Sequence, residues 1–204
     1  LWSLLGVLPF WVPYFVHFAK PAFSHSDRVP TGYIFYDMPY YSAIGRAVFE
    51  RGNAFAGPNP NDADPEAPAI YFHWINWALG LGITQFGIDP GLLFVGLGAV
   101  GGLACGRMTL ALVAAVLPRR DYLGPLFLVA MWGGGLLIVA GLAKHLLFGG
   151  RLTENVLAFD PGEGNWHLYW GRNIVFPTEA VYHALAAAIW LATIRGRHGL
   201  AIVW

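Results

Sequence analysis

Asp37 is the acidic residue whose surroundings best fit a chemical role. It lies in the stretch YDMPYYSAIGRAVFERGN, residues 36–53. An aspartate before a proline-containing first turn is a favoured helix N-cap. The spacing of the apolar residues predicts one helix face, made of Tyr40, Tyr41, Ile44, Val48 and Phe49. Amides at a helix N-terminus hold a carboxylate in place and keep it ionised. Asp37 is therefore predicted as a helix cap, and the same environment suits a fixed base or metal ligand, so the two roles are compatible.

Asp62 and Asp64 form an Asp-x-Asp pattern in the loop sequence GPNPNDADPEAP, residues 57–68. Two carboxylates with this spacing can share a divalent metal such as Mg²⁺ or Mn²⁺, which prefer oxygen ligands. The same cluster of Asn, Asp, Pro and Gly is typical of a turn. Both interpretations stay open at this point: a metal or substrate site, and a simple turn.

Four other ionisable residues are candidates for binding a phosphate-bearing substrate. Glu179 and His183 are four positions apart, so they share a face of a predicted helix, and Arg172 precedes them. Arginine is a natural donor to phosphate, and charged groups at the mouth of a membrane helix are costly unless they face a cavity or a partner. His73 is expected at the depth of a lipid headgroup. The structural alternatives are a helix cap for Glu179, a snorkelling side chain for Arg172 and an ordinary interfacial residue for His73.

The composition indicates what kind of protein must position these residues. The chain has 204 residues, of which 56% are hydrophobic and 12% are charged, against about 25% charged in typical globular domains. It is therefore predicted to be an integral membrane protein. The formal net charge is zero, which gives no basis for binding nucleic acid. Cys105 is the single cysteine, so no intrachain disulfide can form.

The hydrophobic pattern predicts one all-α membrane domain with about four transmembrane helices and two large outer loops. The predicted spans are residues 1–19, 91–117, 122–147 and 179–197, and the outer loops are 20–90 and 148–178. The first loop is predicted to contain an amphipathic helix at 38–51 and a perimembrane helix at 69–87.

Two compact basic turns set the expected orientation in the membrane. PRRD at 118–121 and RGRH at 195–198 are expected on the cytoplasmic side, because short cytoplasmic loops carry an excess of Lys and Arg. The segment 69–87 then cannot cross and is expected to lie along the outer interface. A bacterial inner membrane with periplasmic outer loops is the expected location.

The order of these segments resembles the N-terminal half of the GT-C superfamily of membrane glycosyltransferases. That superfamily includes protein mannosyltransferases and the aminoarabinose and arabinofuranosyl transferases. The resemblance covers about residues 1–125 and departs at Met38, where many members have a second acid. It is carried by YDMPYYSAIGRAVFERGN for the acidic motif, PEAPAIYFHWINWALGLG for the perimembrane helix, FGIDPG for a turn and LPRRDY for the basic turn.

The resemblance implies transfer of a sugar from a polyprenyl phosphate at the outer membrane face. Asp37 would activate the acceptor hydroxyl or hold a metal on the phosphate. GT-C enzymes generally have seven or more spans, whereas about four are predicted here, so the chain is either such an enzyme or a truncated module of one. The alternative is a non-catalytic accessory subunit packed against other membrane subunits. Its support is the Gly-rich segments GLGAVGGLACG and WGGGLLIVAG, whose small residues permit close helix contact.

Overall fold

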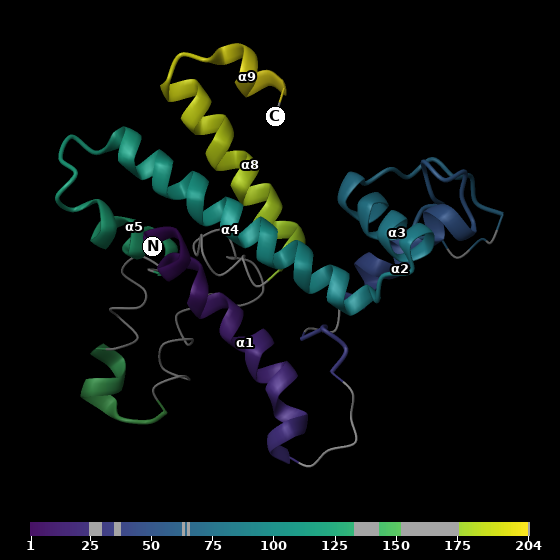
Figure 1. Ribbon diagram of the computed structural model, residues 1–204, viewed down its shortest axis with the longest axis horizontal. Helices are drawn as coiled ribbons and strands as arrows, with labels where there is room; N and C mark the ends of the chain where they lie inside the picture. The colour runs from purple at the N-terminus through teal and green to yellow at the C-terminus, as the bar shows by residue number, and fades with distance from the viewer. Residues whose placement is uncertain are drawn as a thin grey trace. The chain divides into compact units, whose positions relative to one another are not determined.

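The computed structural model describes residues 1–24, 30–34, 38–62, 64, 66–132, 143–151 and 176–203. This part of the chain is mostly helical and contains no strand, which confirms the predicted helical class for the described residues. The named helices are α1 (Trp2–Ser24), α2 (Met38–Glu50), α3 (Trp74–Phe86), α4 (Pro90–Val116), α5 (Leu123–Trp132), α8 (Pro177–Ile194) and α9 (His198–Val203) (Figure 1).

Among the described residues, α4 is the one helix that is both long and apolar enough to cross a membrane. Its 27 residues span roughly 40 Å at about 1.5 Å per residue, against a hydrocarbon core of about 30 Å. Helices α1 and α8 overlap the predicted spans 1–19 and 179–197. The predicted span 122–147 is described only in part, as α5 and a helical segment at 143–148. One candidate span supports association with a membrane, and the four-span arrangement stays a prediction.

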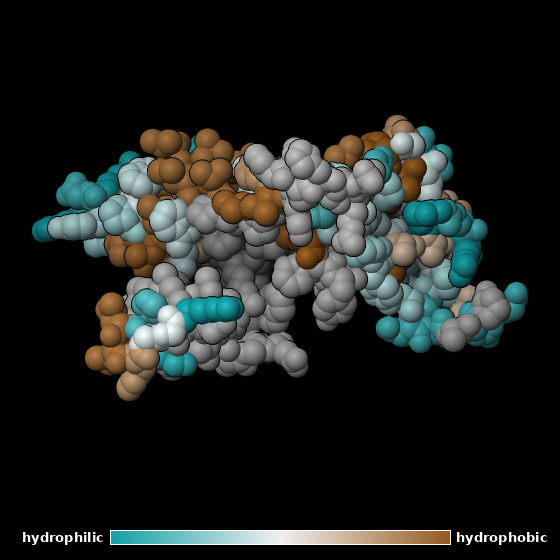
Figure 2. Space-filling model, turned by 90° about the horizontal axis from the view of Figure 1, so that it is seen from below, coloured by the Kyte–Doolittle hydropathy of each residue, from teal (hydrophilic) through white to brown (hydrophobic). Residues whose placement is uncertain are grey.

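The surface of the helices carries many large apolar side chains (Figure 2). On α1 they recur at helical spacing and form a stripe of Leu4, Leu8, Val12, Phe15 and Val16, each about half or more exposed. A stripe of this kind on a long helix fits contact with lipid, because an exposed apolar face of that length is uncommon on a water-soluble surface.

The chain divides into two compact units, which are treated separately below. Unit 1 comprises Leu1–Trp11 and Val100–Trp204, and unit 2 comprises Val12–Ala99. The core of unit 1 is formed by Val7, Cys105, Phe127, Met131, Ala180 and Ala184.

Glycines of α4 allow the helices of unit 1 to approach closely. A Cβ added at Gly106 would lie 2.7 Å from Val7 Cγ2 on α1, and one at Gly101 would lie 2.8 Å from Val181 Cγ2 on α8. Real Cβ atoms do not come so close, so an added Cβ at either position would make the valine side chain or the helix shift. The predicted role of GLGAVGGLACG in close helix contact is therefore realised within the chain itself.

Unit 2 is built around the packing of α2 against α3. The two helices touch backbone to backbone at Gly45 and Gly80. A Cβ on Gly45 would lie 2.8 Å from the Gly80 amide nitrogen and closer still to the carbonyl oxygen of Asn76. Here the small residues fix the helix pair, as they do between membrane helices.

The loop between α2 and α3 is closed at its base. Gly57 and Tyr71 form an isolated antiparallel bridge, with both N–H···O distances at 2.9 Å. The rings of Phe55 and Phe72 stack beside it with centroids 4.7 Å apart. Trp77 Nε1 of α3 donates to the Ala54 carbonyl oxygen at 3.0 Å. The described residues 59–62, 64 and 66 form the tip of this loop, beyond the bridged base.

Ala54 adopts a left-handed backbone with φ of 66°. Left-handed geometry costs a residue with a Cβ about 1–2 kcal/mol, and glycine loses about 0.5–1 kcal/mol more conformational entropy on folding. Ala54→Gly is therefore expected to raise the free energy of unfolding by roughly 0.5 kcal/mol. The measurement is the thermal unfolding midpoint in detergent. Ala47→Gly, inside α2, is the matched control and should lower the midpoint, and an equal fall for both variants would contradict the expectation.

Candidate functional site

A cavity of about 370 Å³ lies in unit 2, between the loop before α2, α2 itself and the start of α4. Its volume falls in the range of roughly 300–1,000 Å³ typical of small-ligand sites. The lining residues come from three separate stretches of sequence: Pro30, Thr31 and Tyr33; Pro39, Ser42, Ala43 and Arg46; Asp89, Pro90 and Gly91.

The loop at residues 30–34 is held against α1 and α4 by specific contacts. Gly32 has φ of +79°, and its amide donates to His17 Nε2 of α1 at 3.2 Å. A Cβ on Gly32 would lie 2.6 Å from the carbonyl oxygen of Gly91. The Tyr33 hydroxyl donates to Ser42 Oγ of α2 at 2.9 Å, and its ring packs against that of Phe94. These contacts fix the wall of the cavity that the loop provides.

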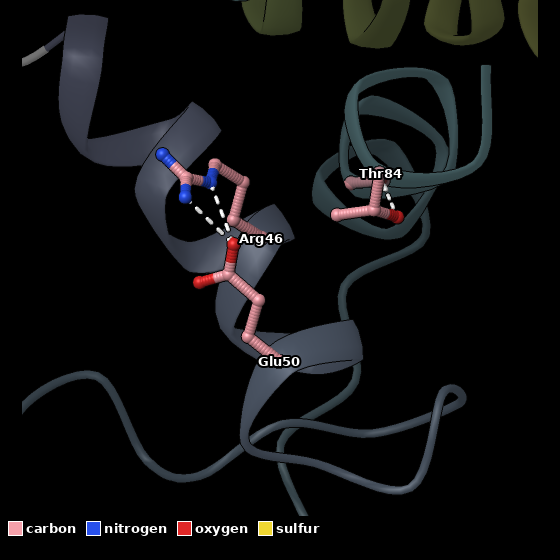
Figure 3. Close-up of polar contacts among 4 residues, drawn as sticks. Arg46, Glu50 and Thr84 are labelled. Atoms are coloured by element: carbon pink, nitrogen blue, oxygen red, sulfur yellow. Dashed lines mark hydrogen bonds and ion pairs between the residues drawn. The ribbon is translucent and has the colours of Figure 1, made fainter. Parts of the chain in front are cut away.

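Among the described residues that line the cavity, Arg46 carries a positive charge and Asp89 a negative one. Arg46 donates to Glu50 Oε1 through Nε at 3.0 Å and Nη2 at 2.7 Å, one helical turn along α2 (Figure 3). Both side chains are about half exposed, so the pair adds little stability, but it orients the guanidinium. Asp89 Oδ1 accepts the Leu92 amide at 2.9 Å and thereby caps α4.

Figure 3 also shows Thr84 of α3, whose side chain is bonded within its own helix. The Thr84 hydroxyl donates to the Gly80 carbonyl oxygen of its own helix at 2.7 Å. This bond satisfies the polar side chain of Thr84 within α3.

Asp37, the predicted catalytic acid, and Arg172, a predicted substrate-binding residue, lie outside the described residues. Tyr33 and Pro39, which precede and follow Asp37 in the sequence, both line the cavity.

Asp62 and Asp64 are exposed at the tip of the loop and form its turns. Asp62 Oδ1 accepts the Asp64 amide at 3.0 Å, and Asp64 Oδ1 accepts the Glu66 amide at 2.9 Å. These bonds account for the Asp-x-Asp spacing as two successive Asx turns. Among the described residues, no third His, Cys, Asp or Glu joins them in a group that could hold a metal ion. The Mg²⁺ or Mn²⁺ site stays a prediction.

Glu179 and His183 lie in unit 1, in the first two turns of α8. His183 Nδ1 contacts the carbonyl oxygen of Glu179 at 2.8 Å, which fixes the ring along the helix. The N-cap is Phe176, which makes no side-chain capping bond, and Pro177 occupies the first turn. Glu179 is therefore not the cap residue itself. Its carboxylate lies in the first turn of α8, where it interacts favourably with the positive end of the helix dipole.

His73 is the N-cap of α3, where its Nδ1 accepts the Asn76 amide at 3.4 Å. The helix begins at Trp74, five residues later than the predicted start at 69. The difference arises because Tyr71 is extended in its bridge to Gly57. Burial lowers the pKa of His73 from its usual 6.5, an effect opposed by a backbone hydrogen bond.

The lowered pKa of His73 predicts a loss of stability in acid. Because the pKa of His73 is lower in the folded chain, its imidazole binds a proton more readily in the unfolded chain. The free energy of unfolding therefore falls as the pH drops through and below about 6.5, the pKa of an unfolded histidine. We expect the thermal midpoint to fall between pH 8 and pH 5, and His73→Asn, which keeps a capping acceptor, to flatten that part of the profile. His198→Asn, at an exposed histidine, is the matched control. An unchanged profile in the His73 variant would refute this assignment.

Sequence reasoning missed His17, Tyr33, Ser42 and Asp89 as parts of the cavity region. The signals available were the FGIDPG turn, which contains Asp89, and the small polar residue Ser42 within an apolar stretch. Neither identifies a cavity without the contact between residues 31–32 and Gly91. Searches of family models, curated proteins and solved structures found nothing that matches this chain.

Proposed function

We propose that this chain is a GT-C-like membrane protein, a glycosyltransferase or a truncated module of one, that transfers a sugar from a polyprenyl phosphate at the outer membrane face. The observation that supports the proposal is the position of the cavity. Pro90 and Gly91 line it, and they begin α4, the described helix suited to crossing a membrane. We propose that a site at the end of such a helix lies at the depth of a lipid phosphate.

The chemistry of the cavity walls supports the same substrate class. Arg46 and Ser42 offer donors for a phosphate or a sugar hydroxyl, while Pro30, Pro39 and Pro90 supply apolar surface. A polyprenyl-phosphate sugar joins a charged group, a polar sugar and a long apolar chain. A mixed cavity at the membrane boundary fits that combination better than a purely polar or purely apolar one.

In the proposed reaction, the Asp37 carboxylate takes the proton from the acceptor hydroxyl. The freed oxygen forms a bond to the anomeric carbon of the sugar, and the bond between that carbon and the phosphate oxygen breaks. Polyprenyl phosphate leaves with both electrons of the broken bond. Arg172, with His183, is proposed to stabilise the charge that develops on the phosphate, and Glu179 and His73 to position the substrate.

Native mass spectrometry of protein extracted gently from its source membrane tests the proposal. We expect the chain to carry a bound polyprenyl phosphate, and Arg172→Ala to lose it because the guanidinium is the proposed phosphate donor. Arg51→Ala is the matched control, since Arg51 is exposed just beyond α2, and it should retain the lipid. A chain that carries no such lipid and stays bound to other membrane subunits would overturn the proposal and favour the accessory subunit.

A further inference from the structure

A second cavity, of about 180 Å³, lies in unit 1 where α4, α8 and α9 meet. It is smaller than the roughly 300–1,000 Å³ of sites that enclose a whole drug-sized ligand. Two arginines, Arg195 and Arg197, line it together with apolar residues of all three helices. The cavity therefore fits a small anionic group attached to something larger and apolar.

The turn that carries the arginines is a defined structure. The Arg197 amide donates to the Ala192 carbonyl at 2.8 Å, and the Gly196 amide donates to that of Thr193 at 3.0 Å. With Gly196 at φ of 67°, this is the Schellman arrangement that ends many helices. It places one arginine on each side of the glycine, and both arginines line the cavity.

The charge at this turn is uncompensated by the rest of the described chain. Both side chains are exposed, and no described carboxylate forms an ion pair with either. The C-terminal end of α8 carries only about half a negative charge, against two permanently charged guanidiniums.

The remaining walls of the cavity are apolar. Leu191 and Ala192 of α8 are buried, and Ala188 of α8, Met108 of α4 and Leu200 of α9 complete the apolar lining. Helix α9 also presents Ile202, which is 85% exposed. Cations beside exposed apolar side chains, at the end of an apolar helix, are the combination that recognises lipid headgroups at a membrane surface.

We propose that this cavity binds the headgroup phosphate of an anionic phospholipid, with Arg195 and Arg197 as its donors and Leu200 against the adjoining glycerol and first methylene groups. The inference requires the chain to lie in a membrane and does not depend on the proposed transfer reaction. A lipid is favoured over a free phosphate because five of the seven lining residues are apolar and offer nothing to a small, fully hydrated ion.

The test is native mass spectrometry of the full chain in detergent, with equal amounts of dioleoyl phosphatidylglycerol and dioleoyl phosphatidylcholine. We expect one phosphatidylglycerol per chain to be retained with a preference of roughly 10- to 30-fold, as expected for two basic side chains at an anionic headgroup. The double variant Arg195→Gln/Arg197→Gln should lose this preference. Leu200→Asp should weaken it as well, because it puts a carboxylate against the phosphate.

The matched control is Arg119→Gln/Arg120→Gln, which removes the same charge from the other basic turn, outside the cavity. It should keep the preference, and thermal midpoints should show that all variants remain folded. An equal loss in both double variants would indicate general charge attraction and overturn the proposal, as would a preference that survives Arg195→Gln/Arg197→Gln. Displacement of the lipid by an equal concentration of glycerol phosphate would overturn the lipid assignment in favour of a small phosphate.

Discussion

Asp37→Asn is expected to lower the rate of glycosyl transfer by roughly two to four orders of magnitude, the contribution usual for a general base. The asparagine amide has nearly the same shape and can still cap a helix, but it cannot accept the proton of the acceptor hydroxyl. The protein is reconstituted in vesicles with mannosyl, aminoarabinosyl or arabinofuranosyl polyprenyl phosphate. The measurement is the release of polyprenyl phosphate.

Two controls separate loss of chemistry from loss of structure. Glu66→Gln removes an exposed acid from the loop between α2 and α3 and should leave the rate unchanged. Asp37→Asn should still carry bound polyprenyl phosphate in native mass spectrometry, since the proposed phosphate donors are untouched. If Asp37→Asn were as active as the unmodified chain, Asp37 would not be the general base.

Gly80→Val is expected to lower the free energy of unfolding by roughly 1–3 kcal/mol or more, the usual cost of overpacking. A Cβ at Gly80 would meet the carbonyl of Gly45 on the facing helix and lie 2.9 Å from Phe49 Cδ2. Because one of these obstacles is backbone, the helices themselves must move apart. The measurement is the thermal midpoint in detergent, with Gly45→Ala as a second variant that acts on the same contact.

Gly96→Ala is the matched control for this contact. Gly96 lies inside α4 and is exposed, and a Cβ added there would have no atom of a neighbouring element within 4 Å. Helix propensity favours alanine over glycine by about 1 kcal/mol, so this variant should be neutral or stabilising. If Gly80→Val behaved like Gly96→Ala, the close contact between α2 and α3 would be wrong.

Helix α2 shows what the sequence could predict. Its predicted range of 38–51 is close to the observed Met38–Glu50, because helical periodicity and a final glycine mark its ends. Ile44 and Val48 of the predicted face are buried, but Tyr40 is 45% exposed and Ser42 and Gly45 are buried in its place. A hydrophobicity pattern favours large residues, whereas close backbone contact with α3 selects small ones.

The cavity beside α2 could not have been predicted in the same way. Its walls come from residues 30–33, 39–46 and 89–91, and they meet through the tight approach of Gly32 to Gly91, which leaves no periodic signal. Asp62 and Asp64, in the predicted first outer loop, were recognisable as turn formers or ligands from their residue types alone. Only the hydrogen bonds that Asp62 and Asp64 accept from backbone amides show that the turns are formed.

The closed base of the loop between α2 and α3 makes the tip of this loop a suitable insertion site for an epitope tag. The bridge of Gly57 to Tyr71 and the stacked rings of Phe55 and Phe72 isolate the two helices from any change made beyond them. A short epitope inserted after Asn61, which is exposed, would lengthen the tip without pulling on either helix. Antibody access to that epitope in sealed and opened vesicles would show directly which side of the membrane this loop faces.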